Sequence, residues 1–224
     1  MDVPDRPPRR VVVVGAGMVG LATAWFLQEH GAEVAVLDRS GVGAGASWGN
    51  AGYLAPVMAV PLPEPGLLRE GLRGLPDPTA PLHLSPRLRL ATLEFLLRFA
   101  ARSTAAAWRA GMRALTPLDR AALAAFDELA AGGVAAPTHE APVLIGFPPG
   151  TADAALRHEL DGVRAAGQEV RLSVEPDVGP PFSDRIATVL RLDGQRHVDP
   201  GGYLTCLAES VSYTHLTLPT NREV

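Results

Sequence analysis

The sequence predicts an α/β fold, and three features between residues 11 and 38 carry that prediction. Val11–Val14 is a β-branched run, which is typical of a strand buried on both faces of a parallel sheet. A helix is expected next, with Gly31 just past its C-terminus, because apolar residues recur there at helical spacing. Glu33–Leu37 then has the character of a second strand. Together they form a parallel strand–helix–strand unit.

The turn between the first strand and the helix carries Gly15, Gly17 and Gly20 in the spacing G-x-G-x-x-G. Gly15 permits a tight turn, Gly17 lets a pyrophosphate approach the backbone, and Gly20 allows the helix to pack close to the strand. The amides and dipole of a helix N-terminus attract phosphates. Asp38 follows Gly20 by 18 residues, close to the spacing of the acid that binds a ribose hydroxyl. The sequence therefore predicts a Rossmann-like dinucleotide site.

A second informative stretch, Ser40–Pro56, is rich in glycine and begins directly after the second strand. Its small residues allow the backbone to lie against a flat ligand, and Ser47, Asn50 and Gly52 offer polar and backbone contacts. A plain nicotinamide-dependent dehydrogenase is expected to have an ordinary crossover helix here instead. On these residues alone, a surface loop with a turn at Asn50–Gly52 is an equal alternative.

Composition excludes several classes of protein. The chain has 224 residues, of which 47% are hydrophobic and 20% charged, with a net charge of −4, as in an ordinary globular protein. A mildly acidic chain gives no reason to expect a nucleic-acid partner. No apolar run approaches the roughly 20 residues of a membrane span. The charged, proline-rich start of the chain does not resemble a signal peptide.

Histidine and cysteine usage gives no sign of a metal site or a disulfide. The six histidines lack metal-ligand spacing, so no metal is expected. The single cysteine, Cys206, excludes an internal disulfide, suits a reducing compartment and is expected to be a buried thiol. The location is accordingly predicted to be cytoplasmic.

Beyond residue 86 the pattern predicts helices mixed with strands. Helices are expected over 87–131, with a break where Thr116 would cap a new helix and Pro117 would take its first position. The arginines at 89, 98 and 102 are interpreted as a solvated helix face, with a substrate-carboxylate site as the alternative. The other expected elements are strands at 140–147, 168–174 and 188–192, a helix at 151–166 ended by Gly167, and a helix that begins at Asp199-Pro200.

The two glycine-rich motifs, VVVVGAGMVGLATAWFLQEHGAEVAVLDR and GASWGNAGYLAP, together resemble the D-amino acid oxidase-like superfamily of FAD-dependent amino-acid oxidoreductases. Ser47–Gly52, as S-x-x-N-A-G, is most similar to the D-amino acid dehydrogenases, with glycine and sarcosine oxidases as near relatives. The resemblance implies FAD as cofactor. It assigns the pyrophosphate to Gly15, Ala16, Gly17, Met18, Val19 and Gly20, the adenosine ribose to Asp38 with Arg39 beside it, and the pyrophosphate and flavin ring to Ser47, Asn50, Ala51 and Gly52.

By resemblance, the reaction is oxidation of a D-amino acid to an imino acid, which water converts to a 2-oxo acid. Hydride leaves for flavin N5, and a quinone or oxygen then accepts the electrons. No catalytic residue is assigned, because the arginine and tyrosine that grip the substrate in such enzymes belong to a C-terminal half. The alternatives are a glycine/sarcosine-type oxidase of the same fold, a nicotinamide-dependent dehydrogenase and a non-catalytic fragment. Relatives that reduce quinones touch the inner face of the membrane, although no amphipathic anchor is evident in this sequence.

The resemblance also predicts the order of the parts. These are an incomplete FAD-binding domain at 1–60, a proline-rich connector at 61–86, a partial α+β substrate domain at 87–197, and a helix returning to the FAD domain at 198–210. Residues 211–224 are expected to be a non-native tail, because one reading frame of a sequencing-library adapter encodes VSYTHLTLPT. The chain is therefore interpreted as an N-terminal fragment that is inactive alone and binds FAD weakly.

Overall fold

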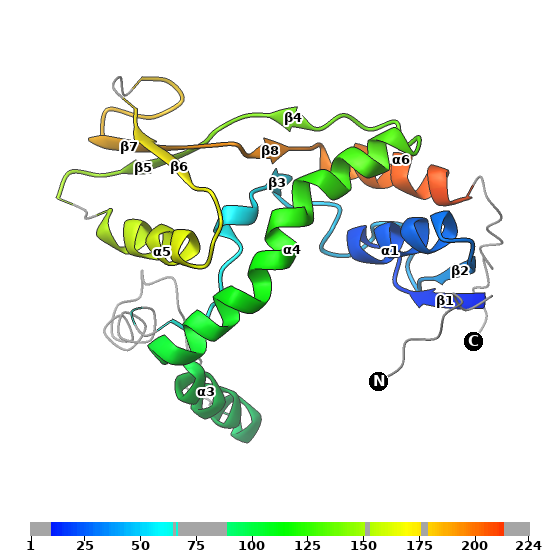
Figure 1. The fold of residues 1–224 in the computed structure, drawn as a ribbon, viewed down its shortest axis with the longest axis horizontal. Coiled ribbons are helices and arrows are strands. Elements are labelled where there is room, and N and C mark those ends of the chain that lie inside the picture. The colour runs from blue at the N-terminus through cyan, green and yellow to red at the C-terminus, as the bar shows by residue number, and fades with distance from the viewer. Residues whose placement is uncertain (1–9, 65, 67–88, 151–152, 176–178, 213–224) are drawn as a thin grey trace. The chain divides into compact units, whose positions relative to one another are not determined.

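The computed structural model describes residues 10–64, 66, 89–150, 153–175 and 179–212 (Figure 1). Most of the expected connector, the start of the helix expected at 151–166 and residues 213–224 of the expected tail lie outside the described residues. The chain divides into two compact units. The first unit comprises Met1–Leu54, Ala124–Ala141 and Arg196–Val224, and the second unit comprises Ala55–Leu123 and Pro142–Gln195.

The first unit begins with the predicted strand–helix–strand arrangement. β1 (Arg10–Val14) pairs in parallel with β2 (Glu33–Leu37), and α1 (Met18–Glu29) connects them. α1 ends with a C-cap at His30, and Gly31 follows with φ +80°, the left-handed conformation expected of a C′ glycine. The βαβ unit predicted from the sequence is therefore confirmed.

The prediction that Val11–Val14 is buried on both faces is wrong. Val12 is 60% exposed and Val14 is 83% exposed, and Leu37 on the neighbouring strand is also exposed. Val34 and Val36, on the opposite face of the pair, are buried. Within the described residues β1 has one strand neighbour, and the core packs against only one face of the pair. A β-branched run reports strand propensity, but burial depends on what covers each face.

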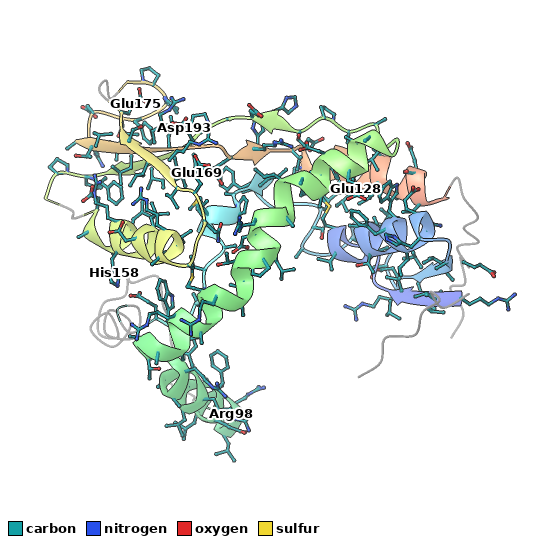
Figure 2. All side chains as sticks on the ribbon, viewed as in Figure 1. Arg98, Glu128, His158, Glu169, Glu175 and Asp193 are labelled. Carbon is teal, nitrogen blue, oxygen red and sulfur yellow. The ribbon has the colours of Figure 1, made fainter. Side chains whose placement is uncertain are left out.

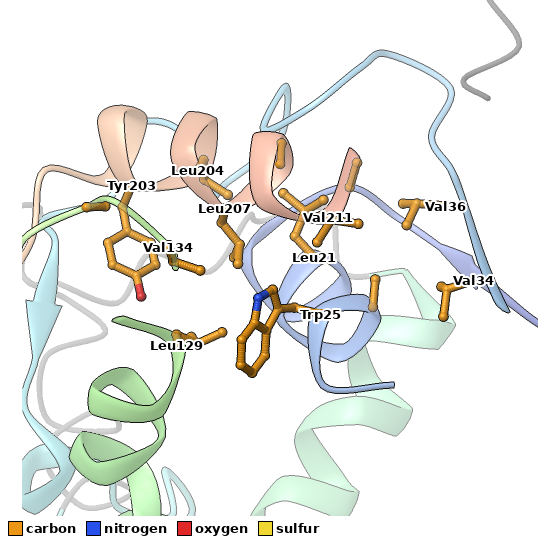
Figure 3. Close-up of a cluster of buried hydrophobic side chains, with 14 of the residues drawn as sticks. Leu21, Trp25, Val34, Val36, Leu129, Val134, Tyr203, Leu204, Leu207 and Val211 are labelled. Carbon is orange, nitrogen blue, oxygen red and sulfur yellow. The ribbon is translucent and has the colours of Figure 1, made fainter. Parts of the chain in front are cut away.

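Helix α6 (Pro200–Ser212) closes the core of the first unit. It packs against α1, and Leu21 and Trp25 of α1 meet Leu204 and Leu207 of α6 in one buried cluster (Figure 3). The predicted start of α6 is confirmed, since the Gly202 N–H donates to Asp199 Oδ2 at 3.0 Å. Cys206 is half-buried against this cluster rather than fully buried.

The end of α6 overlaps the stretch expected to be non-native. Val211 is fully buried in the same cluster (Figure 3), and its carbonyl accepts a bond from Gln28 Nε2 at 3.2 Å. The origin of residues 211–224 stays a prediction.

A small antiparallel sheet completes the first unit, in the order β3 (Tyr53–Leu54), β8 (Arg196–His197), β4 (His139–Glu140). Arg196 donates two hydrogen bonds to the carboxylate of Asp127, at 2.5 and 3.2 Å. Those bonds hold the pKa of Asp127 below its usual value.

The expected helix break at Thr116-Pro117 is wrong. α4 (Ala105–Ala131) continues through Pro117, and the Thr116 hydroxyl donates to the Met112 carbonyl at 2.8 Å instead of capping a new helix. The break lies earlier, where Ser103 ends α3 (Leu90–Arg102). A proline inside a helix costs about 3 kcal/mol of helix stability. The helix nevertheless continues through Pro117, and α4 has buried side chains before and after it, at Met112 and Leu129.

The second unit contains an antiparallel sheet in the order β5 (Val143–Phe147), β7 (Thr188–Asp193), β6 (Arg171–Val174), together with the short 3-10 helix η1 (Pro56–Met58). Its core joins Leu192 of β7 to Leu160 and Val163 of α5 (Ala154–Ala165) and to Trp108 of α4. α5 ends at Gly167 with φ +99°, as predicted.

The single strand expected at 140–147 is two strands with different partners. β4 pairs with β8 in the first unit, and β5 pairs with β7 in the second unit. Pro142 lies between them, and a proline has no N–H to donate to a ladder. Which of these parts forms a functional domain stays a prediction.

Candidate functional site

The candidate cofactor site is built around the turn from β1 into α1. Gly15 has φ +111°, which favours glycine, and its N–H donates to the Leu37 carbonyl at 2.7 Å. A Cβ at Gly20 would collide with the Gly15 carbonyl oxygen, so only glycine lets the helix start this close to the turn. Two of the three motif glycines therefore have the local roles that the spacing predicts.

The N-terminus of α1 presents free backbone donors. Within the part of the chain that the structure describes, the N–H groups of Gly17, Val19 and Gly20 have no acceptor, whereas the Met18 N–H donates to Ser47 Oγ at 3.1 Å. Val19 is 81% exposed, so this end of the helix is open. Unpaired amides at the positive end of a helix dipole bind anions such as phosphates.

Gly17 packs against Ser47 and leaves no room there for a side chain. A Cβ at this position would lie 2.9 Å from Ser47 Oγ. The serine hydroxyl thus occupies the space beside the glycine while it bonds to Met18. Ser47 is 29 residues away from Met18 in sequence, and the structure brings the two predicted site residues together.

Asp38 lies beside the same turn. Its Oδ2 accepts the Ala16 N–H at 2.9 Å, and its Oδ1 accepts the Ser40 N–H at 2.8 Å. These backbone bonds, with Ala16 the larger contributor, lower the pKa of the Asp38 carboxyl despite a small opposing effect of burial. Asp38 is therefore a carboxylate at neutral pH, and it ties the end of β2 to the glycine turn. Arg39 is exposed and adds a weaker electrostatic lowering of that pKa.

The loop through Ser47–Gly52 is held by its own side chains. Asn50 Nδ2 donates to the Ser47 carbonyl at 2.8 Å, and Asn50 Oδ1 accepts the Gly52 N–H at 2.7 Å. Gly52 has φ +69°, and a Cβ there would collide with the Val198 carbonyl oxygen. Asn50 therefore shapes the loop, while Ala51 is exposed beside it.

Sequence reasoning missed Gly43, which packs this loop against α6. Its N–H donates to the Ala16 carbonyl at 2.9 Å, and a Cβ would lie 3.1 Å from Leu204 and 3.3 Å from Trp48. The loop contains several glycines, and the sequence does not indicate which of them packs against α6. Only the structure identifies Gly43 as that residue.

The structure also pairs two histidines that are distant in sequence. His139 and His197 lie opposite each other in the β4–β8 ladder, with ring centroids 5.2 Å apart, and Tyr53 faces His197 from β3. All three are exposed. Among the described residues no three His, Cys, Asp or Glu side chains are grouped to hold a metal ion.

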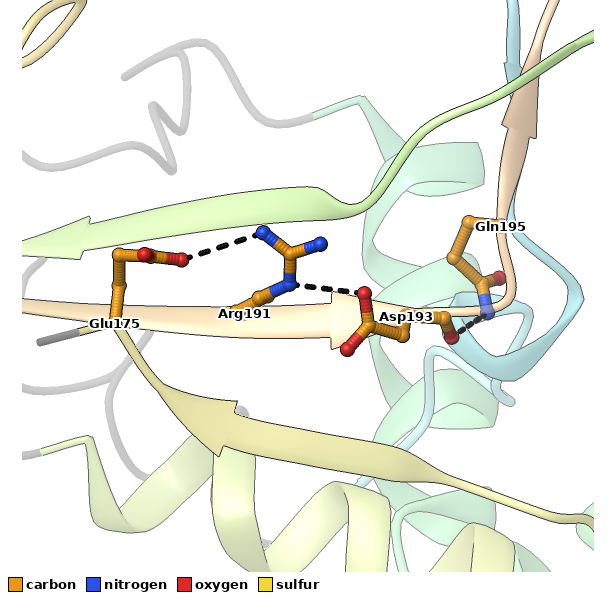
Figure 4. Close-up of polar contacts among 4 residues, drawn as sticks. All are labelled: Glu175, Arg191, Asp193 and Gln195. Atoms are coloured by element: carbon orange, nitrogen blue, oxygen red, sulfur yellow. Dashed lines mark hydrogen bonds and ion pairs between the residues drawn. The ribbon is translucent and has the colours of Figure 1, made fainter.

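The second unit contains a polar cluster of its own (Figure 4). Arg191 pairs with Asp193 at 2.9 Å and with Glu175 at 3.4 Å, and these carboxylates raise the pKa of its guanidinium. Gln195 donates to the Asp193 carbonyl at 3.0 Å, and its buried Oε1 has no partner within the described ranges. Because two carboxylates already neutralise Arg191, the cluster is not an open anion site.

These contacts define a class of protein. It is an α/β protein with a glycine-rich turn of the dinucleotide-binding type, exposed amides at a helix N-terminus and a carboxylate at the end of β2. The family model "DAO: FAD dependent oxidoreductase" matches residues 10–223. The chain belongs to this family of FAD-dependent oxidoreductases. The resemblance stated from the sequence is confirmed.

Curated relatives are similar over part of the chain. A D-amino acid dehydrogenase of Phenylobacterium zucineum is 43% identical over 89 residues, which is 39% of this chain and 21% of that protein. A D-amino acid dehydrogenase of Granulibacter bethesdensis is 37% identical over 100 residues, 44% of this chain and 24% of that protein. The match thus spans about a quarter or less of the curated relatives' own length.

Solved structures share the fold. L-alpha-glycerophosphate oxidase from Mycoplasma pneumoniae, solved with FAD bound, has a TM-score of 0.56 and 15% identity, covering 94% of this chain and 44% of that one. Glycine oxidase from Bacillus cereus has a TM-score of 0.53 and 16% identity, covering 94% and 46%. These similarities confirm the predicted α/β fold class. None of the helices in the described part of the chain is long and apolar enough to cross a membrane.

Proposed function

We propose that this chain carries the cofactor-binding part of an FAD-dependent oxidoreductase and that FAD binds at the turn into α1. The observation that carries the proposal is the set of amides at Gly17, Val19 and Gly20 that have no acceptor among the described residues, at an exposed helix N-terminus. Membership of an FAD-dependent family supports FAD over a nicotinamide.

The residues fit the parts of the cofactor in turn. The turn formed by Gly15, Ala16, Gly17, Met18, Val19 and Gly20, with Ser47, would hold the pyrophosphate. Asp38 would accept a ribose hydroxyl while keeping its backbone bonds, since a carboxylate has about four acceptor sites. Arg39 lies beside it, and Asn50, Ala51 and Gly52 would follow the flavin ring. FAD, when bound, supplies the two-electron chemistry that the side chains lack.

The proposed reaction of the whole enzyme is oxidative deamination of a D-amino acid. The substrate loses its α-hydrogen with two electrons and a proton from nitrogen, and water hydrolyses the imino acid to a 2-oxo acid and ammonia. The name shared by the relatives at 37–43% identity supports this substrate class and an acceptor other than oxygen, such as a quinone. We assign no catalytic residue to this chain, and we place the enzyme in the cytoplasm or against the inner face of the membrane.

The cofactor proposal is tested by titrating FAD into the chain and following its fluorescence. Gly17→Ala places a Cβ 2.9 Å from Ser47 Oγ and disturbs the Ser47–Met18 bond beside the amides, so we expect FAD affinity to fall about tenfold, equivalent to about 1.4 kcal/mol. Gly45→Ala is the matched control, because its Cβ would meet nothing within 4 Å. Equal loss in both variants, or displacement of FAD by stoichiometric NAD, contradicts the proposal.

Substrate class is tested by dye reduction with the holoenzyme that contains this chain. D-Alanine should be oxidised in preference to L-alanine, glycine or sarcosine, without peroxide formation. Preferential turnover of glycine or sarcosine with peroxide would instead support the oxidase alternative.

A further inference from the structure

Strands β4 and β8 of the first unit place two imidazoles side by side. His139 and His197 are directly opposite each other in the antiparallel register, and their ring centroids are 5.2 Å apart with an angle of 30° between the ring planes. Both residues are exposed. Opposed residues of an antiparallel pair have Cβ atoms only about 4.5–5.5 Å apart, so the backbone itself keeps these two side chains together.

The backbone beneath this histidine pair is fixed by further contacts. β8 is the central strand of its sheet and pairs on its other side with β3, where Tyr53 lies opposite His197. Directly after β8, Val198 is buried, and its N–H donates to the Gly52 carbonyl at 2.9 Å. His197 therefore projects from a strand with a neighbour on each side, and a ligand of both imidazoles has little backbone left to order.

The neighbouring charged residues belong to the opposite face of the sheet. Successive residues of a strand alternate between the two faces, so Glu140 and Arg196 lie on the other side from the imidazoles. Arg196 bonds there to the carboxylate of Asp127, which offsets its positive charge. Among the described strands of this sheet, the face with His139 and His197 thus carries no arginine that would repel a cation.

We infer that His139 and His197 together bind one divalent transition-metal ion, such as Zn²⁺ or Cu²⁺. Neutral imidazole is a common ligand for these ions, whereas Mg²⁺ and Ca²⁺ prefer oxygen. Two nitrogens at about 2.1 Å from one ion lie roughly 3 Å apart. Rotation of the exposed rings about χ2, a torsion with broad preferences, turns one nitrogen of each ring toward a shared ion. Water molecules complete the coordination.

The ion links parts of the chain that are distant in sequence. His139 follows α4 and His197 precedes α6, and both helices contribute to the core of the first unit. A ligand that binds only the folded state stabilises it by mass action. The spacing of histidines along the chain did not indicate this site, because its two ligands come from strands that meet only in the fold. The inference goes beyond the proposed function and does not depend on FAD.

The experiment is calorimetric titration of Zn²⁺ into the full 224-residue chain, freed of metals by a chelating resin and without added FAD. Phenylalanine keeps an aromatic ring at either position but offers no nitrogen donor. His139→Phe and His197→Phe should each weaken Zn²⁺ binding by about tenfold or more, since a single imidazole lacks the advantage of two linked donors. His158→Ala is the matched control, because His158 of α5, labelled in Figure 2, is an exposed histidine of the second unit.

Two further measurements separate a metal ligand from a packing contact. Zn²⁺ at about a hundred times its Kd should raise the Tm of the first unit by about 5 °C or more in the parent and in His158→Ala, but in neither phenylalanine variant. Electron paramagnetic resonance of the Cu²⁺-loaded parent should show splitting from two imidazole nitrogens. Far-UV circular dichroism verifies that each variant keeps the secondary structure of the parent chain.

A Zn²⁺ site that both phenylalanine variants lose and His158→Ala keeps supports the inference. It is overturned if the parent binds Zn²⁺ with a Kd weaker than about 1 mM. It is equally overturned if either phenylalanine variant binds Zn²⁺ as well as the parent, if His158→Ala weakens binding as much as they do, or if Mg²⁺ binds the same site as tightly as Zn²⁺.

Discussion

The two compact units each pack one tryptophan against one glycine. In the first unit Trp25 of α1 lies against Gly132, and in the second unit Trp108 of α4 lies against Gly162 of α5. A Cβ at either glycine would collide with the indole ring. Both tryptophans are nearly buried, at 4% and 7% exposure. The same tryptophan–glycine contact therefore occurs in the unit with the parallel βαβ arrangement and in the unit with the antiparallel sheet β5–β7–β6.

Two kinds of polar contact can be compared between the units. In the first unit, side chains near the site bond to backbone amides: Asp38 to Ala16 and Ser47 to Met18. In the second unit, a buried carboxylate, Asp119, meets a side-chain amide, Gln168, at 2.9 Å. The turn that presents these amides follows from glycine spacing, which is visible in a sequence. Which distant side chain meets the turn, or meets another side chain, depends on the fold.

The largest expected effect separates the two cores. Trp25→Ala should lower the free energy of unfolding of the first unit, and Trp108→Ala that of the second unit, each by about 3–5 kcal/mol. Urea unfolding followed by circular dichroism should then show one transition moving while the other stays. Trp48→Ala is the control, because Trp48 is 56% exposed. If both variants move a single shared transition equally, the units unfold as one.

A smaller effect should mark the backbone-dependent loop of the first unit. Gly52→Ala forces φ +69° on a residue with a Cβ and drives that atom into the Val198 carbonyl, so we expect a loss of about 1–3 kcal/mol. Gly49→Ala has open space and should change stability by less than about 0.5 kcal/mol. Equal urea midpoints for the two variants would mean that the loop does not depend on its glycine.

Alkaline pH should weaken the first unit through Tyr203. Burial, with a smaller contribution from Cys206, raises the pKa of Tyr203 to about 12. The unfolded chain releases this proton at its ordinary pKa near 10, so the free energy of unfolding should fall as pH rises from 10 toward 12. Tyr203→Phe should flatten that fall in urea denaturation measured across this pH range. An unchanged slope in the variant would assign the fall to other groups.

The smallest effect compares two carboxylates at acid pH. Backbone bonds lower the pKa of Asp38, so its contribution to stability is present above the ordinary value of 3.8 and is lost as pH falls through the lowered pKa. Burial raises the pKa of Asp119, so its contribution is present below 3.8 and is lost as pH rises through the raised pKa.

Through these two groups, lowering the pH should reduce the free energy of unfolding of the first unit but not that of the second unit. Asp38→Asn should remove this part of the acid sensitivity of the first unit, and Asp119→Asn should flatten the pH response of the second. Urea midpoints of the two transitions measured between neutral and acid pH test both statements. Parallel movement of the two midpoints in the parent chain would contradict them.

Much of the first unit was predictable from local pattern. The G-x-G-x-x-G turn, the C′ glycine at Gly31 and the Asp199 cap were each expected and are each present. These features depend on backbone conformation and hydrogen bonds within a few residues, and particular residue types are needed for them. The ligand roles of the site residues remain predictions, because they concern contacts with a molecule rather than with the chain.

The wrong predictions concern burial and continuity. Val12 and Val14 were expected to be covered, and Pro117 was expected to start a helix. A β-branched run predicts an extended strand but not what packs on its faces. A proline lowers helix stability locally, yet α4 continues through Pro117, with Met112 and Leu129 buried on either side of it in the sequence.

The sequence by itself determined the α/β class, the glycine-rich turn into α1, the membership of the FAD-dependent family and the ends of several helices, since these are local in the chain. Only the tertiary structure decided that Ser47 meets Met18, that His139 stacks on His197 and that α3 leaves Phe95 and Leu97 exposed. Contacts between residues distant in sequence, and the absence of cover over a helix, depend on how all elements pack at once. Residue periodicity records which side of an element is apolar, but not whether another part of the molecule covers it.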